Sequence, residues 1–220
     1  MLELARSGVA EGLWLRAERQ TSGRGRLGRA WISPIGNVYA STLVRLRPTD
    51  PEAASLALVA AVVLQEAVCA YLGDVSDAVL KWPNDLLLCG AKLSGILLER
   101  ADAAVVIGFG VNLAHHPTGL DRATTSLAAH GILVDPANFV ETLADTFAHW
   151  RDIWRGQGMA PVRARWIERA HPSGTPLTAR LPDDSAVDGL FDGLDATGAL
   201  VLRLADGGRR VIHAADVFLL

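Results

Sequence analysis

The stretch VLKWPNDLLLCGAKLSGILLERADAAVVIGFGVNL, residues 79–113, contains four short β-rich runs separated by turn residues. The runs cover residues 79–82, 85–88, 94–99 and 105–111. The third and fourth runs are too apolar to be edge strands, because strands buried on both faces read as nearly continuous apolar segments. The stretch therefore predicts the middle of a mixed β-sheet.

Further elements are expected on both sides of this stretch. Asp50-Pro51-Glu52 places a capping residue before a first-turn proline, and one apolar face continues from there to about Tyr71, which predicts a central helix. Alternation and helical periodicity predict a helix over residues 2–7, strands over 13–18 and 37–46, and helices over 136–154 and 160–169. Together they indicate an α+β fold with helices on one side of the sheet.

The pattern changes after His171-Pro172-Ser173-Gly174 to short alternating strands separated by turns such as Asp192-Gly193. We therefore expect two domains, residues 1–172 and a β-barrel-like module over residues 173–220. A module of this size buries little of its own core, so it should dock on the first domain.

Composition limits the classes of function. The chain has 220 residues, 50% of them hydrophobic, and a net charge of -3, so a packed core is expected and no global field attracts nucleic acid. The longest apolar stretch, residues 53–64, is shorter than the roughly 20 residues that span a bilayer. The N-terminus has no basic segment followed by an apolar one, and the spacing of Cys69 and Cys89 fits neither a metal site nor a disulfide framework. We expect a cytoplasmic protein with no membrane partner.

Three arginines alternate with three glycines in Gly23-Arg24-Gly25-Arg26-Leu27-Gly28-Arg29, just after a predicted strand. Glycines let the backbone approach a ligand, and guanidinium groups match phosphate or carboxylate, so this arginine loop predicts an anion site. The same letters satisfy G-x-G-x-x-G, but a dinucleotide site requires a helix to begin at the third glycine, and Ala30-Trp31-Ile32-Ser33-Pro34 follows instead. A solvated loop without a ligand remains the alternative.

Lysine is scarce, because only Lys81 and Lys92 are lysines among the 21 basic residues, and 21 minus 2 leaves 19 arginines. This choice indicates two places that need a compact ammonium group. Lys81 opens Lys81-Trp82-Pro83-Asn84-Asp85, where the proline holds Trp82 extended and so aims the lysine. Lys92 precedes Gly95, which leaves room for a ligand on the backbone of the strand. A snorkelling surface lysine is the plainer interpretation of Lys81.

Taken together, the arginine loop, Lys-Trp-Pro-Asn-Asp at residues 81–85, Lys-Leu-Ser-Gly-Ile-Leu at 92–97 and Gly-Phe-Gly-Val-Asn at 108–112 resemble the catalytic domain of biotin protein ligases, and the resemblance covers essentially the whole chain. It implies a class II synthetase-like biotin/lipoate ligase fold with a C-terminal SH3-like β-barrel. It also implies that biotin and ATP form biotinyl-5′-adenylate, with Mg²⁺ as the metal, and that biotin then passes to a lysine of a biotin carboxyl carrier protein or domain.

The resemblance also implies roles for individual residues. Catalysis would fall to Arg26 and Lys81, which lie nearest the activated carboxylate and the α-phosphate. Trp31 would cover the tail of biotin and the adenylate once the loop closes. Biotin would contact Gln20, Thr21, Gly23, Arg24, Trp31, Lys81, Gly95 and Ile96. The nucleotide would contact Arg24, Arg26, Arg29, Asn84, Lys92, Asn112, Thr125 and Ser126.

The chemistry agrees with this assignment, because a carboxylate that attacks an α-phosphate brings two anions together and needs fixed cations to neutralise them. No side-chain nucleophile is required. The alternatives are a lipoate ligase or octanoyl transferase of the same architecture, a non-catalytic RNA-binding module, and a degenerate ligase that binds without turnover.

Several expectations concern partners and metals. His115-His116-Pro117 has no third ligand at a useful spacing, so we predict a turn and no protein metal site. Members of the family usually begin with a further strand that carries Ser-Thr-Asn, and this sequence begins at Met1 within the next helix. No winged-helix region precedes the catalytic segment, so we expect no DNA partner. The sequence leaves the oligomeric state open, including a homodimer.

Overall fold

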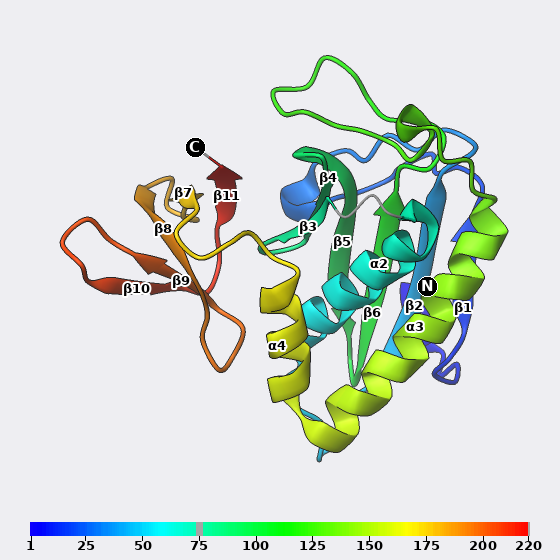
Figure 1. Cartoon of the computed structure of the whole chain (residues 1–220). Coiled ribbons are helices and arrows are strands. Elements are labelled where there is room, and N and C mark those ends of the chain that lie inside the picture. Colours follow the sequence, from blue (N-terminus) through cyan, green and yellow to red (C-terminus); the bar gives the residue numbers. More distant parts are fainter. Residues whose placement is uncertain (74–76, 220) are drawn as a thin grey trace.

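The computed structural model describes residues 1–73 and 77–219, and its larger sheet has six strands in the order β1-β2-β6-β5-β4-β3 (Figure 1). Their bounds are Trp14–Ala17 (β1), Val38–Arg45 (β2), Ala78–Lys81 (β3), Asp85–Leu88 (β4), Ala91–Ala101 (β5) and Ala104–Val111 (β6). β5 and β6 lie in the middle, as predicted, whereas β3, which belongs to the same predicted stretch, is an edge strand. Every pair of neighbouring strands is antiparallel, so the predicted mixed sheet is wrong. Tight turns join β3 through β6, and parallel pairing would need long crossovers instead.

Three helices cover one face of this sheet: Leu56–Leu72 (α2), Pro136–Gln157 (α3) and Met159–Glu168 (α4) (Figure 1). Ile107 and Phe109 of β6 face them in the main core. The short helix α1, Leu2–Arg6, packs with Leu43 and Val106, which point to the opposite face because side chains alternate along a strand. The prediction of helices on one side therefore holds for the three long helices and not for α1.

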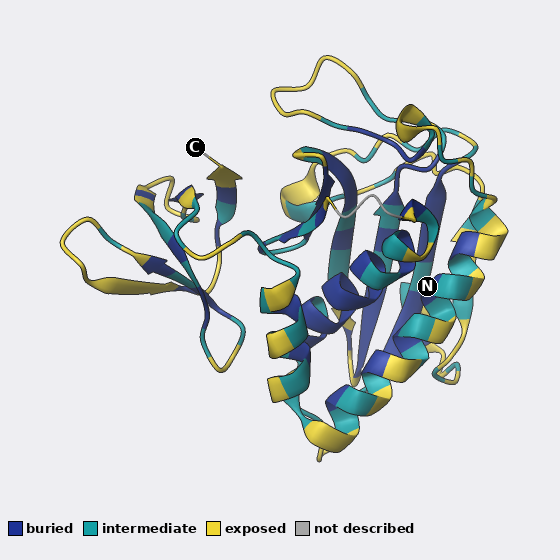
Figure 2. Ribbon diagram, viewed as in Figure 1, coloured by how far each residue is buried: buried dark blue, intermediate teal, exposed yellow. Residues whose placement is uncertain are grey.

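The central helix α2 is the most deeply buried of the helices, and Figure 2 shows α3 buried mainly along the side that faces the core. Helix α2 and the 3₁₀ turn before it, η2 (Ala53–Ser55), together form a 20-residue segment with a mean hydropathy of 2.0. By length and composition this segment could cross a membrane, and it is longer than the apolar stretch of residues 53–64 noted in the sequence. However, 67% of its most apolar window is buried within the fold. Such burial is typical of a core helix.

The start of α2 differs from its prediction. Asp50 does not cap the helix; its carboxylate accepts hydrogen bonds from the backbone N–H of Arg47, at 3.0 Å, and from Arg155 of α3, at 3.2 Å. A cap of the expected kind occurs instead at α3, where Asp135 accepts from the N–H groups of Ala137 and Asn138 ahead of the first turn.

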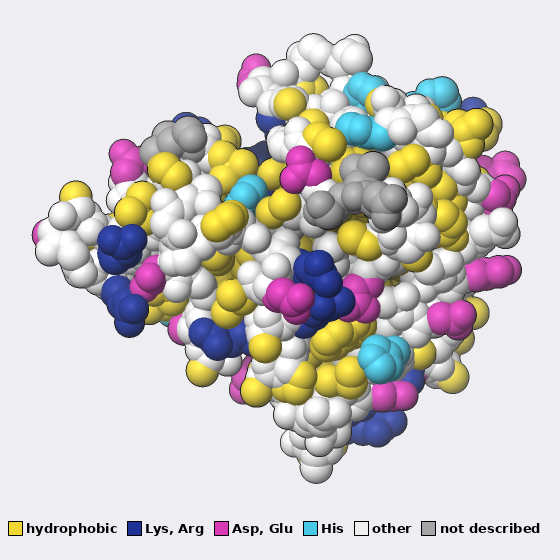
Figure 3. All heavy atoms as spheres, in the orientation of Figure 1, with side chains coloured by type: hydrophobic (Ala, Val, Ile, Leu, Met, Phe, Trp, Pro, Cys, Tyr) yellow, Lys and Arg dark blue, Asp and Glu magenta, His cyan; other side chains and the backbone are white. Residues whose placement is uncertain are grey.

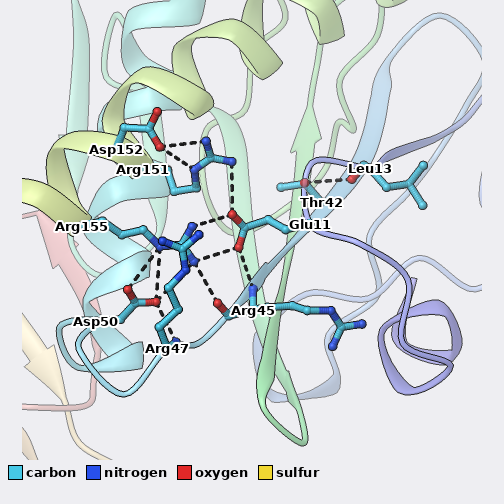
Figure 4. Close-up of polar contacts among 9 residues, drawn as sticks. All are labelled: Glu11, Leu13, Thr42, Arg45, Arg47, Asp50, Arg151, Asp152 and Arg155. Atoms are coloured by element: carbon cyan, nitrogen blue, oxygen red, sulfur yellow. Dashed lines mark hydrogen bonds and ion pairs between the residues drawn. The ribbon is translucent and has the colours of Figure 1, made fainter.

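Glu11 anchors the N-terminal segment to the rest of the domain (Figure 4). Its carboxylate accepts hydrogen bonds from Arg155 of α3 at 2.6 and 2.9 Å and from the backbone N–H of Arg45 in β2 at 2.9 Å, and Arg151 lies 3.3 Å away. Burial alone would raise the pKa of Glu11, but these hydrogen bonds and charges hold it below its ordinary value.

The C-terminal strands form a second antiparallel sheet, in the order β10-β9-β8-β7-β11. Their bounds are Pro176–Arg180 (β7), Ala186–Leu194 (β8), Leu200–Arg203 (β9), Arg209–Ile212 (β10) and Asp216–Leu219 (β11). The predicted small β-module is therefore present as five strands, with β10 and β11 as its two edges, and no strand pairing within residues 77–219 closes it into a barrel. Leu220, the last residue of the predicted module, lies outside the described residues.

This second sheet docks on the first domain, as expected for so small a module. Trp166 of α4 packs against Phe191 of β8 with ring centroids 6.4 Å apart. Arg163 donates to the carbonyl oxygen of Leu194 at 2.9 Å, and the Trp82 indole donates to that of Gly198 at 3.2 Å. One continuous hydrophobic core therefore runs through both domains.

Candidate functional site

A cavity of about 450 Å³ lies on the face of the large sheet opposite the long helices. Its floor is formed by β5 and β6, where Gly95, Gly108 and Gly110 point into it from positions that alternate with core residues. Because these positions carry no side chain, they leave room over the backbone of both strands, and the indole of Trp31 occupies part of it at Gly95 and Gly110. The arginine loop and β11 of the second domain form its walls.

The arginine loop connects β1 to β2 and is closed at its base. Gly25 N–H donates to Arg29 O at 2.7 Å, and Trp31 N–H donates to Gly23 O at 2.9 Å. A side chain at position 23 would not fit, since its Cβ would lie 2.4 Å from Trp31 O. At the tip, residues 26–28 form one 3₁₀ turn (η1, Arg26–Gly28), and no α-helix begins at the third glycine. The geometry of a dinucleotide-binding turn is therefore missing.

Three cations surround the buried carboxylate of Asp85. Lys92 pairs with one oxygen, while Lys81 and Arg122 lie 3.3 and 3.9 Å from the other. Burial by itself would raise the pKa of the Asp85 carboxyl, but these three cations outweigh it and hold that pKa below its ordinary value. Burial lowers the pKa of Lys92, and pairing with Asp85 offsets this only in part. One carboxylate shared by three cations leaves positive charge available to an anion.

Arg26 and Lys81 reach the same cavity from two segments of the first domain, the arginine loop and the end of β3. Arg26 donates to Asn84 Oδ1 at 3.4 Å, and Lys81 donates to the carbonyl oxygen of Val217 in β11 at 2.8 Å. Arg24 lies 3.8 Å from Glu99, and Arg29 pairs with Asp216. The guanidinium groups of the loop and the ammonium group of Lys81 at the end of β3 therefore line one cavity, as the predicted anion site requires.

The indole of Trp31 already lies inside the cavity, against its floor. A Cβ at Gly110 would lie 2.6 Å from Trp31 Cε2, so only glycine admits the ring there. Lys92 Nζ lies 5.6 Å from the ring centroid, a cation–π geometry. Trp31 Nε1 is buried and has no hydrogen-bond partner among the described residues. An indole held in this way can pack on a ligand that shares the cavity.

The structure brings most of the residues predicted from the sequence together around this cavity. Those that line it are Gln20, Arg24, Arg26, Arg29, Trp31, Lys81, Asn84, Lys92, Gly95 and Ile96. Thr21, Gly23, Asn112, Thr125 and Ser126 do not line it. Asn112, for example, is buried and donates to Thr125 O at 3.0 Å, which ties the end of β6 to the segment beside Lys92.

Two histidines, His116 of the predicted turn and His130, lie within hydrogen-bond distance of the hydroxyl groups of residues 125 and 126. His116 Nδ1 lies 3.0 Å from Ser126 Oγ, and His130 Nε2 lies 2.9 Å from Thr125 Oγ1. Within residues 1–73 and 77–219, no group of three or more His, Cys, Asp or Glu side chains is placed to hold a metal ion.

Sequence reasoning missed the acids of the site. Asp85 belongs to a motif that was singled out, and its position four residues after Lys81 was a usable signal. Asp216 lies 187 residues from Arg29, and nothing local to either residue predicts that they meet. Arg122 was likewise missed, because it comes from a loop with no pattern of its own.

Comparison with known proteins agrees with this architecture. The family model "Biotin/lipoate A/B protein ligase family" matches residues 4–112, and "Biotin protein ligase C terminal domain" matches residues 173–220. A biotin–[acetyl-CoA-carboxylase] ligase of Paracoccus denitrificans is 41% identical over 96% of this chain and 92% of its own length. The ligase of the same name from Mycobacterium tuberculosis is 33% identical over 98% of this chain and 82% of its own length.

Among solved structures, the biotin protein ligase of Aquifex aeolicus in complex with biotin and ATP superposes with a TM-score of 0.88 at 23% identity, over 99% of this chain and 94% of that one. This likeness concerns the fold. The sequence relatives and the two matched models decide the family: the chain belongs to the biotin protein ligases.

Proposed function

We propose that this chain is a biotin–[acetyl-CoA-carboxylase] ligase, which activates biotin with ATP and transfers it to a lysine of a carrier domain. One observation carries the proposal: Arg26 of the loop and Lys81 of the sheet, with Lys92 beside them, converge on one glycine-floored cavity. A cavity with this charge suits a small acid and a nucleotide that must react with each other.

In the first step a biotin carboxylate oxygen attacks the α-phosphorus of ATP, a new P–O bond forms, and pyrophosphate leaves. Both reactants are anions, so their approach depends on fixed positive charge. Lys81 and Lys92 stand at the centre of the cavity, and the arginine loop supplies its guanidinium groups from the opposite wall. We assign Arg26 and Lys81 to the carboxylate and the α-phosphate, and Lys92 to support of the phosphates.

In the second step the uncharged amine of a carrier lysine attacks the carbonyl carbon of biotinyl-5′-adenylate. An amide bond forms, AMP leaves with the bonding electrons, and the amine gives up a proton. The mixed anhydride is sensitive to water, so its enclosure has a clear use. Trp31, which lies on the cavity floor beside Gly110, is placed to cover the tail of biotin.

We assign the ring of biotin to the part of the cavity beside the Trp31 indole, over β5 and β6, with its carboxylate directed toward Arg26 and Lys81. Gln20 and Ile96 line this region of the cavity and support the assignment. Three carboxylates that line the cavity, those of Asp85, Glu99 and Asp216, are engaged by lysine or arginine, and the described residues contain no group of three or more His, Cys, Asp or Glu side chains placed to hold a metal ion. Mg²⁺ would therefore be bound by phosphate and water, as is usual for this ion, and we derive no step from it.

The carrier is expected to be a biotin carboxyl carrier protein or domain, and we place the reaction in the cytoplasm. Two free cysteines, Cys69 and Cys89, are consistent with a reducing compartment. The net charge of -3 argues against the alternative of an RNA-binding module, and on the face that Figure 3 shows basic side chains are scattered among acidic ones.

The test is an exchange assay with ATP, magnesium and radiolabelled pyrophosphate, run with biotin, with lipoate or with neither acid. Biotin-dependent entry of label into ATP is the expected result. Exchange that depends on lipoate would move the chain to the lipoate branch of the fold. No exchange with either acid, from a protein that melts cooperatively, would refute the proposed activation step.

A further inference from the structure

Three cations of the cavity meet three consecutive residues of the C-terminal domain. Arg26 lies 3.5 Å from the carbonyl oxygen of Ala215 and 3.8 Å from the carboxylate of Asp216. Arg29 pairs with the other oxygen of the same carboxylate, and Lys81 donates to the carbonyl oxygen of Val217 at 2.8 Å. The start of β11 therefore contacts both the arginine loop and the end of β3.

Asp216 supplies the carboxylate that holds the tip of the arginine loop, beside weaker contacts of Arg26 with Asn84 Oδ1 and Ala215 O. The backbone hydrogen bonds of the loop are internal to it, and Leu27 at the tip is 77% exposed. The Asp216 side chain is only 17% exposed and faces two guanidinium groups at once. A carboxylate in such a position neutralises charges that would otherwise repel each other.

The ion pairs of the cavity leave an excess of positive charge. Six cations take part: Arg24, Arg26, Arg29, Lys81, Lys92 and Arg122. Three carboxylates, Glu99, Asp85 and Asp216, pair with them, and Asp121 also lines the cavity, so six minus four leaves two positive charges for the substrates. Of these four acids, Asp216 is the one that pairs with Arg26 and Arg29.

We propose that Asp216 is an internal counter-ion that latches the arginine loop to β11 in the free enzyme and is displaced by the phosphates of ATP. Carboxylate and phosphate oxygens seek the same N–H groups of a guanidinium fork, and the two anions repel each other. Nucleotide binding must therefore separate Asp216 from Arg26 and Arg29. This inference rests on the proposed function only in naming ATP as the competitor.

The position of β11 suits this exchange. Among the described strands it pairs only with β7, so its other edge can lose contacts with the loop without loss of a strand pairing. Lys81 Nζ donates to the backbone carbonyl oxygen of Val217, and this bond does not depend on the Asp216 carboxylate. When ATP binds and displaces Asp216, the arginine loop therefore loses its ion pairs to the C-terminal domain.

The first test is limited proteolysis of the full chain without ligand, with trypsin as the probe, because the loop carries three arginines. In Asp216→Asn the loop loses its anchor, and cleavage after residues 24, 26 and 29 should become several times faster than in the wild type. Asp216→Glu retains the charge and should restore protection. Asp192→Asn is the matched control, since it removes an ion pair of 2.7 Å to Arg209 within the same domain and away from the cavity.

The second test is calorimetric titration of the same proteins with ATP and magnesium in the absence of biotin. Asp216→Asn should bind ATP about two to five times more tightly than the wild type, the range expected for release of a partly exposed ion pair. Asp216→Glu and Asp192→Asn should match the wild type.

Equal cleavage of Asp216→Asn and the wild type, or ATP binding that weakens or stays the same in Asp216→Asn, would overturn the latch. A wild type that binds no ATP would instead count against the proposed function. If the wild type binds no ATP, the rates of tryptic cleavage of the wild type and Asp216→Asn without ligand still show whether Asp216 anchors the arginine loop.

Discussion

Replacement of Lys81 by methionine tests the central charge of the proposed site. The substitution preserves much of the side-chain volume and removes the ammonium group that contacts Val217 O at 2.8 Å and Asp85 at 3.3 Å. One carbonyl oxygen loses a charged donor, which costs about 1–2 kcal/mol. Asp85 keeps Lys92 and Arg122 as partners, so no buried carboxylate is left unpaired. For a chain of this size the loss corresponds to a fall in melting temperature of about 2–8 °C, and the fold should persist.

The effect of Lys81→Met on activity should be much larger. A fixed donor directed at charge in the transition state is typically worth about 100- to 1000-fold in rate. Biotin-dependent pyrophosphate exchange, measured beside the melting curve, should fall by that factor. Lys81→Arg is the control that retains charge with a different geometry and should recover only part of the loss. Exchange by Lys81→Met within about threefold of the wild type would remove Lys81 from the mechanism.

Three further substitutions test other parts of the structure. Gly110→Ala places a Cβ 2.6 Å from the Trp31 ring, so it should displace the indole and weaken biotin binding by about 1–3 kcal/mol in a calorimetric titration. Gly108→Ala is the control, because its Cβ would meet atoms no closer than 3.6 Å and should not move Trp31. The tryptophan fluorescence spectrum of the chain should therefore change in Gly110→Ala and stay unchanged in Gly108→Ala. Glu11→Gln should lower the free energy of unfolding by about 1–2 kcal/mol at pH 7. Since the pKa of Glu11 lies below 4.5 in the folded chain, its contribution is present above that pH and is lost as the pH falls through the folded pKa; urea titrations of variant and wild type should therefore converge in acid. Gly198→Ala combines a φ of +91° with a Cβ 2.7 Å from Leu58 Cδ1, so it should reduce the melting temperature by several degrees more than Gly207→Ala, which has a φ of +83° and open space around it.

Local pattern was sufficient to predict most elements of secondary structure. β2, β4 and β6 lie within a residue of their predicted bounds, because apolar runs between turn residues are a local signal. The N-terminus of α2 could not be predicted in the same way. Asp50 and Pro51 form a typical helix start, but Asp50 is taken by Arg155, which is 105 residues away. An ion pair made in the tertiary structure took priority over local capping.

The composition of the site divides along the same line. Arg26, Lys81 and Lys92 could be predicted because each stands in a motif whose chemistry is visible in a few neighbouring residues. Asn112, Thr125 and Ser126 belong to similar motifs but are buried in hydrogen bonds that support β5 and β6, outside the cavity. Residue type and spacing indicate that a polar group is needed and do not show which side of a strand it serves.

The sequence by itself determined the family, the order of the elements and the positive charge of the cavity, since these depend on residues close together in the chain. Only the tertiary structure decided that the large sheet is antiparallel throughout, that the second sheet stays open, and that Asp216 closes on the arginine loop. The physical reason is that strand pairing and ion pairing between distant segments depend on how the segments meet in space. A carboxylate at residue 216 acquires its role only when the C-terminal domain docks on the first domain and brings β11 to the arginine loop.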